Sequence, residues 1–161
     1  MPYIHHYRSP IGILKITAEE DCITGLSLCT EETPNKENVQ ETLSNCIPLL
    51  QQTCRELTEY FEGERTTFNI PIKYTTGTAF QHSVWNALQD IPYGETRSYG
   101  DIAVAIGNPK AVRAIGQANH RNAILLLVPC HRVINKDGSI GGFGCGIDIK
   151  KQLLQLEGLL P

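Results

Sequence analysis

A cysteine and a histidine stand side by side at the end of the most apolar stretch of the chain. The stretch covers residues 123–128, and the run PCHR at 129–132 follows it directly, so that a buried strand would deliver Cys130. A thiol attacks as its thiolate, and a buried thiol stays protonated unless a neighbouring base takes the proton. The adjacent His131 could be that base. The pair predicts a cysteine nucleophile, although a buried core thiol beside a surface histidine would have the same sequence.

A carboxylate that could serve this pair comes near the end of the sequence. Glu157 closes the run LLQLE at 153–157, which has the spacing of an apolar-faced helix. A carboxylate can orient an imidazole and stabilise its protonated form. Cys130, His131 and Glu157 are therefore predicted to act as nucleophile, base and orienting group. The same three residues would also suit a Cys-His hydrolase or acyltransferase that turns over.

Two short helices are predicted upstream of the cysteine. Ser98 and Asp101 form a capping-box pattern, which opens a helix that Gly107 ends. A second helix is predicted over residues 109–120, with Asn108 as its cap and a proline in its first turn. Two helices joined by a tight turn are typical of a helix-turn-helix, which binds DNA in some proteins and protein partners in others.

The rest of the chain supplies a framework in which no catalytic cluster is recognisable. Short β-prone runs in the first half alternate with turn residues, and two longer runs have helical spacing. The predicted elements are strands at 3–8, 12–17, 22–28 and 68–72, helices at 50–61 and 80–91, an exposed loop at 30–39 and a linker at 73–78.

Composition and charge indicate a globular protein with two unlike halves. Of 161 residues, 41% are hydrophobic, and the net charge is −3. Residues 1–74 have 6 Lys/Arg against 11 Asp/Glu, whereas residues 75–161 have 8 against 6. Any contact with phosphate is therefore expected in the second half, with modest, salt-sensitive affinity. We expect no membrane span and no signal peptide, because no apolar run is long enough and the N-terminal pattern is absent.

The six cysteines are expected to remain reduced, because a cytosolic protein rarely forms disulfides. No zinc site is predicted, since the chain has no C-x-x-C pair and the spacing from Cys22 to Cys29 is too wide for a usual finger. His5 and His6 would be the residues to meet those cysteines in space. We predict neither a metal nor another cofactor.

Several motifs, taken together and in this order, resemble the O6-alkylguanine-DNA alkyltransferases, a family also called methylated-DNA–protein-cysteine methyltransferases. The resemblance is dense over residues 79–158 and loose before them. It rests on FQHSVW at 80–85, IPYGETRSYG at 91–100, GNPKAVRAIG at 107–116, Asn122, PCHRV at 129–133 and GGFG at 141–144.

The resemblance implies both a fold and an activity. The fold would be an α/β N-terminal domain at 1–74, a small RNase H-like sheet plus a helix, followed at 75–161 by a mostly helical, winged helix-turn-helix-like domain. The activity would be direct DNA repair, in which one chain irreversibly accepts the alkyl group from O6-alkylguanine, or from O4-alkylthymine, on Cys130. The partner would be double-stranded DNA, bound by a monomer in the cytoplasm, or in the nucleus of a eukaryote.

The resemblance also implies roles for residues that face the DNA. The target base must leave the helical stack to reach a buried thiol, which costs a few kcal/mol. Arg113 would insert where the base has left, and Tyr99 would help to rotate the nucleotide. Asn122 would tie the recognition helix to the strand that carries Cys130. The small residues that would let the helix approach DNA closely include Ala111, Ala114 and Gly116.

A pocket for the flipped base is implied at Val133 and the glycine-rich loop that follows. Phe143 stands where relatives often have tyrosine, Gly144 where serine or alanine is frequent, and Cys145 where the loop often has glycine. Ala123 follows Asn122 in place of a frequent proline. These differences bear on leaving-group activation and substrate size. A rival interpretation is a lesion sensor or transcription factor that shares the architecture and does no chemistry.

Overall fold

The computed structural model describes residues 3–29, 47–141 and 146–160 and divides the chain into two compact units. The first unit contains Met1–Thr75 together with Ala123–Leu127, and the second contains Thr76–Asn122 together with Val128–Pro161. The segment at 123–127 thus packs with the first unit, whereas the domain boundary predicted from the sequence places it in the second domain, at 75–161.

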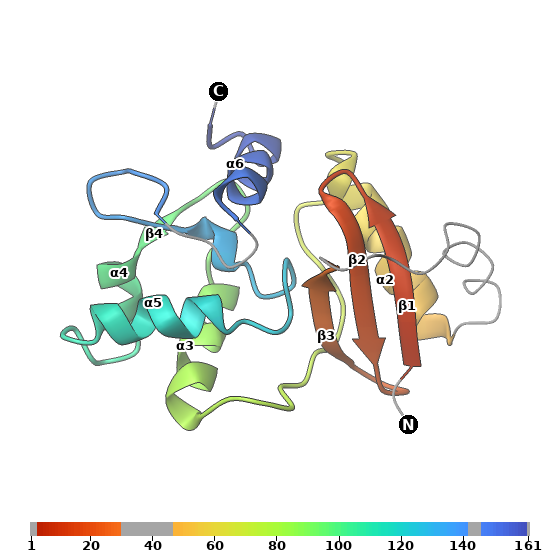
Figure 1. The fold of residues 1–161 in the computed structure, drawn as a ribbon, viewed down its shortest axis with the longest axis horizontal. Helices are drawn as coiled ribbons and strands as arrows, with labels where there is room; N and C mark the ends of the chain where they lie inside the picture. Colours follow the sequence, from red (N-terminus) through yellow and green to blue (C-terminus); the bar gives the residue numbers. More distant parts are fainter. Residues whose placement is uncertain (1–2, 30–46, 142–145, 161) are drawn as a thin grey trace. The chain divides into compact units, whose positions relative to one another are not determined.

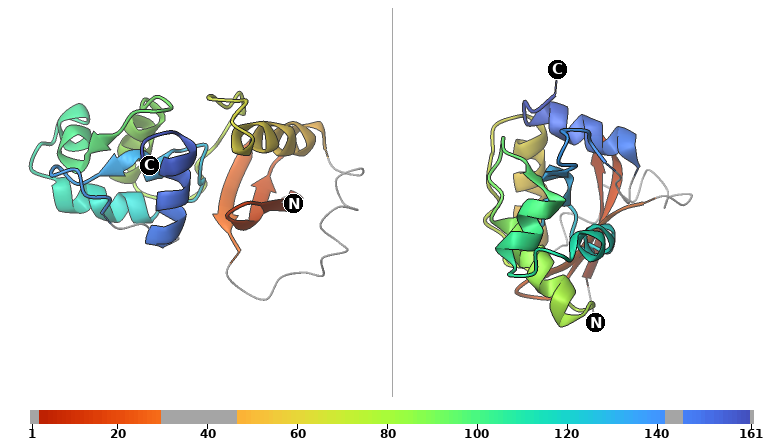
Figure 2. Two further views of the ribbon diagram at one scale, coloured as in Figure 1. Left: turned by 90° about the horizontal axis from the view of Figure 1, so that it is seen from above. Right: turned by 90° about the vertical axis from the view of Figure 1, so that its left-hand side faces the viewer.

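The first unit is an antiparallel sheet in the order β1-β2-β3, with one helix packed against β1 and β2 (Figures 1 and 2). Leu14, Ile16 and Ala18 alternate on the buried face of β2, which is the period that a sheet with one solvent face requires. This confirms the predicted small sheet plus helix. The elements are β1 Tyr3–Ser9, β2 Gly12–Ala18, β3 Ile23–Leu28 and α2 Pro48–Phe61.

The strand predicted at 68–72 is wrong. Ile72 forms only an isolated parallel bridge to Ile23, through bonds from Ile23 N to Pro71 O (2.8 Å) and from Lys73 N to Ile23 O (2.9 Å). Pro71 has no N–H to donate, so the run cannot continue a ladder past this point.

The second unit is mostly helical, as predicted. Helices α3, α4 and α5 pack against one another, and Trp85 on α3 donates from Nε1 to the Ala118 carbonyl on α5 (2.8 Å), which fixes these two helices together. None of the helices in the described ranges is long and apolar enough to cross a membrane. The elements are α3 Ala79–Gln89, β4 Arg97–Ser98, α4 Tyr99–Ala105, α5 Val112–His120, the 3-10 helix η2 Cys130–Arg132, β5 Val133–Ile134, parallel to β4, and α6 Ile147–Leu156 (Figure 1).

The capping box that opens α4 is confirmed, whereas the predicted start of α5 is wrong. The Ser98 hydroxyl accepts from Asp101 N (3.0 Å), and the Asp101 carboxylate accepts from Ser98 N (2.9 Å). Gly107, with φ 78°, follows the last turn of α4. Asn108 does not cap α5: its carbonyl accepts from Ala111 N (3.0 Å) to close a turn, and α5 begins at Val112.

The apolar stretch before Cys130 is not the predicted strand. It makes an isolated parallel bridge between Leu26 and Ile124 and then turns. Leu127 N donates to Leu125 O (2.8 Å) around Leu126, whose φ of 69° is rare for a residue with a side chain. The stretch is apolar because it is buried, and burial alone does not distinguish a strand from a turn.

Candidate active site

A tight turn, rather than a strand, presents Cys130. Pro129 has φ −80° and ψ 67°, and Cys130 N donates to Val128 O (2.8 Å), which is the geometry of an inverse γ-turn. Proline suits this position because its ring already fixes φ near −65°. Cys130 then begins η2 and is 3% exposed. Its sulfur therefore lies inside the second unit.

Two asparagine side chains hold this turn from the region of α5. Asn122, just past the helix, donates from Nδ2 to the carbonyl of Val128 (2.8 Å). Asn119, on the helix itself, donates from Nδ2 to the carbonyl of Cys130 (3.2 Å). The predicted tie from Asn122 to the segment before the cysteine is present, although that segment is a turn. The tie at Asn119 was not expected from the sequence.

A buried ion network lies beside the cysteine. His131 Nε2 is 2.5 Å from Glu157 Oε2, and both side chains are fully buried. Arg132 donates to the same carboxylate from Nε (2.7 Å, to Oε1) and from Nη2 (3.2 Å, to Oε2), and from Nη1 to the Ile91 carbonyl (2.7 Å). This two-point contact fixes the carboxylate plane, and hence the direction from which Glu157 meets the imidazole.

Glu157 is the residue that caps the C-terminal end of α6, one position beyond the helix on which it was expected. The C-terminal end of a helix carries a partial negative charge, which disfavours a carboxylate there. The Arg132 guanidinium offsets this effect because it bonds to the Glu157 carboxylate, and its Cζ lies over the Tyr93 ring, 5.8 Å from the ring centre. Arg132 is thus the counter-ion that makes a buried carboxylate tolerable at this site.

The histidine is poised to receive a proton. Burial lowers the pKa of His131 below its ordinary 6.5, and the hydrogen bond and charge of Glu157 oppose that effect without reversing it. The ring is therefore neutral at pH 7. A carboxylate can only accept, so the Nε2 atom bonded to Glu157 carries the hydrogen and Nδ1 is left as an acceptor. A neutral imidazole with an open acceptor atom is what a base for the Cys130 thiol requires.

A buried lysine also lies near enough to the cysteine to feel its charge. Lys150 on α6 is fully buried and donates from Nζ to the Val133 carbonyl (2.6 Å), with Nζ 6.0 Å from the centre of the Tyr99 ring. Burial lowers the pKa of Lys150 to about 8, and the charge of Cys130 acts in the opposite direction. Burial, with a smaller effect of Cys130, raises the pKa of Tyr99. Tyr99 is therefore a neutral phenol that can donate.

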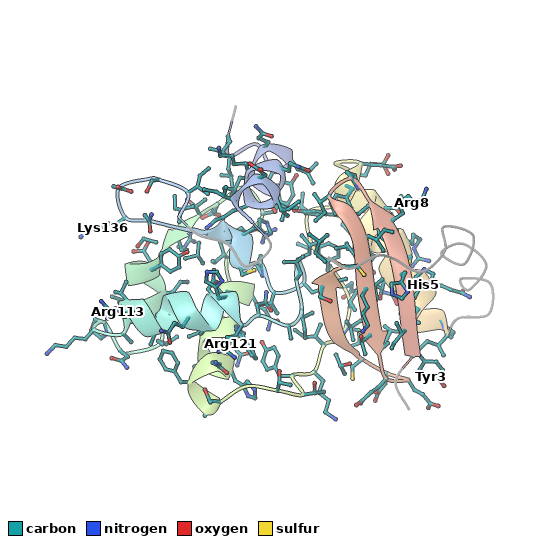
Figure 3. The ribbon with its side chains drawn as sticks, in the orientation of Figure 1. Tyr3, His5, Arg8, Arg113, Arg121 and Lys136 are labelled. Carbon is teal, nitrogen blue, oxygen red and sulfur yellow. The ribbon has the colours of Figure 1, made fainter. Side chains whose placement is uncertain are left out.

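One face of α5 lines a pocket of about 640 Å³ that also includes Tyr99. Arg113 is exposed on this helix, and Arg121 follows its last turn (Figure 3). A Cβ placed on Gly116 would meet nothing within 4 Å, so packing within the protein does not require glycine there. Ala114 is exposed, and Ala111 is half-buried just before the helix. The pocket residues are Gln81, Tyr99, Val112, Arg113, Gly116, Gln117, His120, Arg121 and Asn135.

The structure brings together some of the residues predicted for the site and leaves others out. Cys130, His131 and Glu157 meet in the second unit, and Val133 begins β5 directly after η2. Phe143, Gly144 and Cys145 lie outside the described residues.

Three residues of the site escaped sequence reasoning: Arg132, Asn119 and Lys150. Asn119 and Lys150 could have been noticed in the sequence, because each is a polar residue at a position that helical spacing places on the buried side of its helix. Asn119 follows the buried Ile115 by four positions, and Lys150 precedes the buried Leu153 and Leu154 by three and four.

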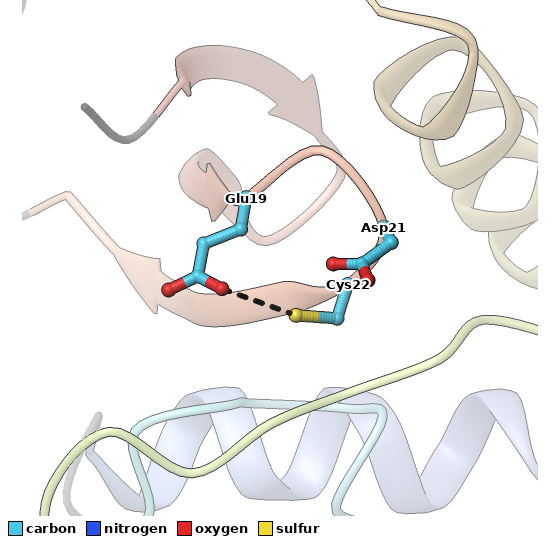
Figure 4. A group of neighbouring side chains, drawn as sticks. All are labelled: Glu19, Asp21 and Cys22. Carbon is cyan, nitrogen blue, oxygen red and sulfur yellow. Dashed lines mark hydrogen bonds between the residues drawn. The ribbon is translucent and has the colours of Figure 1, made fainter.

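One group of potential metal ligands occurs in the described part of the chain, at the turn before β3 (Figure 4). The Cys22 thiol donates to Glu19 Oε2 (3.7 Å), and Asp21 lies beside them. Lys73 pairs with Glu19 (3.6 Å), and burial, followed by the nearby carboxylates, raises the pKa of Cys22. A protonated thiol beside a carboxylate that already has a counter-ion is a poor ligand set, so we assign no metal to it.

Comparison with known proteins places both units in one family. Residues 3–74 match the model of the 6-O-methylguanine DNA methyltransferase ribonuclease-like domain, and residues 79–159 match that of the 6-O-methylguanine DNA methyltransferase DNA-binding domain. The chain therefore belongs to the methylated-DNA–protein-cysteine methyltransferase family. Among its relatives is the constitutive methylated-DNA–protein-cysteine methyltransferase of Bacillus subtilis (strain 168), 50% identical over 159 residues that cover 98% of this chain and 96% of that protein.

Solved structures show the same fold. The O6-methylguanine methyltransferase of Mycobacterium tuberculosis has a TM-score of 0.83 and 40% identity, with coverage of 100% of this chain and 96% of that one. A structure of the same organism's protein in complex with DNA has a TM-score of 0.82 and 39% identity, with coverage of 98% and 94%. These matches extend over both units, including the first half, where the sequence resemblance was loose.

Proposed function

We propose that this protein is a methylated-DNA–protein-cysteine S-methyltransferase that repairs O6-alkylguanine in DNA by moving the alkyl group to Cys130. The observation that carries the proposal is a buried cysteine, joined in sequence to a neutral histidine that a carboxylate and an arginine hold in place, in a chain of this family.

The transfer begins with the thiol proton. His131 Nδ1 takes this proton through a bound water, which leaves a thiolate on Cys130 and an imidazolium paired with Glu157. The sulfur then attacks the alkyl carbon in line: the S–C bond forms as the C–O6 bond breaks, and guanine leaves with the electron pair and takes up a proton. The product is a thioether that no neighbouring group can hydrolyse, so each chain acts once.

The DNA side of the reaction uses α5. Small residues at Ala111, Ala114 and Gly116 let the helix approach the minor groove, and Arg113 fills the space of the extruded base. Tyr99, which lines the pocket beside α5, contacts the target nucleotide and helps to turn it. The backbone at Val133 and the loop that follows read the edge of the flipped base, with O4-alkylthymine as a second substrate.

The reaction also defines the partner and the setting. One monomer binds one lesion in double-stranded DNA, because a single chain carries the nucleophile and the helix that docks. Reduced thiols and DNA are found together in the cytoplasm, or in the nucleus of a eukaryote, so we place the protein there. Among the described cysteines, Cys22, Cys29, Cys54 and Cys130 form no disulfide.

Intact-mass measurement tests this proposal directly. The protein is mixed with a duplex oligonucleotide that holds one O6-methylguanine, and its mass is followed with time. We expect one methyl group per chain, gained irreversibly and located on Cys130 by peptide mapping. Sustained turnover without a mass gain would instead indicate a hydrolase or acyltransferase, and binding without a mass gain would indicate a lesion sensor.

Arg113→Ala is expected to separate base extrusion from chemistry. Arg113 is exposed on α5 and distant in sequence from the thiol network, so its loss should slow repair of duplex DNA by at least about tenfold, as for a residue worth ~1–3 kcal/mol. Reaction with free O6-methylguanine base should be nearly unchanged. Single-turnover rates on the two substrates measure the difference. Equal losses on both would show that Arg113 acts on the fold.

Alkylation should destabilise the protein. Cys130 is buried in a tight turn between two carbonyls that asparagines hold, so an added methyl group overfills its surroundings. Overpacking of this kind costs about 1–3 kcal/mol. The fully methylated form should melt at a lower temperature, be cut faster by protease and release DNA. A methylated protein that melts at or above the temperature of the free form would contradict this expectation.

A further inference from the structure

Asn119 has an unused acceptor next to the nucleophile. Its side chain is 5% exposed, and its Nδ2 atom donates to the carbonyl of Cys130 (3.2 Å). Its Oδ1 atom is buried and has no hydrogen-bond partner. Within the described ranges, the one other buried side-chain nitrogen or oxygen in this state is Nδ1 of His131, the residue that follows Cys130.

The two atoms need the same kind of partner. Nδ1 of His131 is an acceptor because Nε2 donates to Glu157, and an amide oxygen can only accept. A buried acceptor without a donor costs free energy, and native proteins usually satisfy such atoms, often with an ordered water. A water can donate two hydrogen bonds and still accept one. One water in reach of both atoms would satisfy both acceptors, and its oxygen could then receive the Cys130 thiol proton.

We propose that Asn119 is a positioning residue for this proton transfer: its Oδ1 holds the water that joins Cys130 to His131, while its Nδ2 holds the cysteine backbone. The inference rests on the proposed function and adds a residue to it. In the transfer, the S–H bond breaks as the water oxygen gains that proton, and the water passes one of its own protons to Nδ1. The bond to Oδ1 stays in place and stabilises the positive charge that the water carries in passing.

The packing around Asn119 holds its side chain in a fixed position, as a residue that binds the water requires. It lies on the last turn of α5 beside the fully buried Ile115 and the nearly buried Ala118, and the carbonyl of Ala118 accepts from Trp85 (2.8 Å). The helix is thus anchored where the amide leaves it. The Asn119 side chain therefore keeps its position even when the water that it binds moves.

Asn119→Leu tests the proposal, because leucine keeps a similar shape and removes both polar atoms. The rate at which iodoacetamide alkylates Cys130 is followed by peptide mass mapping from pH 5.5 to pH 9. We expect the pH midpoint of this reaction to rise by about one unit, with a roughly tenfold lower rate on the acid side, as one lost hydrogen bond predicts. Binding to duplex DNA should be retained. Asn86→Leu, the same change at an exposed position of α3, is the matched control and should keep the wild-type midpoint.

Two results would overturn the proposal. One is a wild-type pH midpoint in folded Asn119→Leu, even with a lowered melting temperature, since that would make the residue merely structural. The other is an equal shift in Asn86→Leu. If Asn119→Leu does not fold, the smaller Asn119→Val is measured in the same way. The iodoacetamide reaction needs no methylated DNA, so a wild-type protein that failed to take up methyl would refute the proposed function separately.

Discussion

Cys130→Ser is expected to abolish alkyl transfer while binding to the methylated duplex persists. A serine hydroxyl is a far weaker acid than a thiol, and the neutral His131 cannot ionise it to a useful extent at pH 7. We expect the single-turnover rate to fall by at least about 10³-fold, since loss of a nucleophile in other enzymes costs more than that. Quenched-flow assays with the methylated duplex measure the rate, and gel shift measures the binding.

The control for this variant is Cys54→Ser, which alters another buried cysteine, on α2 of the first unit. It should cost some stability and leave transfer intact. Methyl transfer to the serine of the Cys130 variant, or to Cys145 in its place, would show that the nucleophile has been assigned to the wrong residue.

Glu157→Gln is expected to be the most destabilising conservative change in the second unit. The amide keeps the shape of the side chain but leaves the guanidinium of Arg132, 7% exposed, without its counter-ion. Removal of one partner from a buried pair costs about 3–5 kcal/mol. Transfer should also slow, because the amide can no longer stabilise the imidazolium of His131. Urea unfolding gives the loss of free energy, and single-turnover assays give the rate.

Glu59→Gln provides a comparison within the same chain. Glu59, on α2, pairs with Arg65 beyond the end of that helix (3.0 Å), but both side chains are about a third exposed, so the pair is worth about 1 kcal/mol or less. Glu157→Gln should therefore lower the free energy of unfolding several times more than Glu59→Gln does. Equal effects would mean that the Arg132–Glu157 contact is not the buried pair described above. An unchanged pH–rate profile in Glu157→Gln would argue against its orienting role.

Local sequence signals predicted most of the helices and strands, but not the turns before Cys130 or the start of α5. The strands of the first sheet and the capping box at Ser98 depend on residues that are neighbours in sequence, and both were predicted. The turn around Leu126 and the γ-turn at Pro129 depend on pairing with β3 and with Asn122, which local pattern does not encode. The same limit explains the misplaced start of α5, where a turn at Asn108 replaced a cap.

The candidate site shows the same limit, because some of its residues could be predicted from local sequence and others could not. Cys130, His131 and Glu157 were predicted as a set because their types fit a known kind of chemistry, and the structure places His131 against Glu157. Arg132 and Asn119 were not, because their roles depend on partners that the fold brings from elsewhere. Arg132 meets a carboxylate 25 positions later, and Asn119 meets a carbonyl 11 positions later. A sequence shows that such residues are polar, but their partners are known only once the chain has folded.

The separation between Arg132 and Glu157 also bears on how the protein is made. A ribosome that adds about 5–20 residues per second exposes Arg132 roughly 1–5 s before it delivers the carboxylate 25 positions later. During that interval the guanidinium and His131 cannot be buried with their charge partner. The second unit should thus close late in synthesis, whereas the β1-β2-β3 sheet is complete much earlier. Nascent chains halted before residue 157 are expected to be cut by protease within the second unit and to be protected within the sheet.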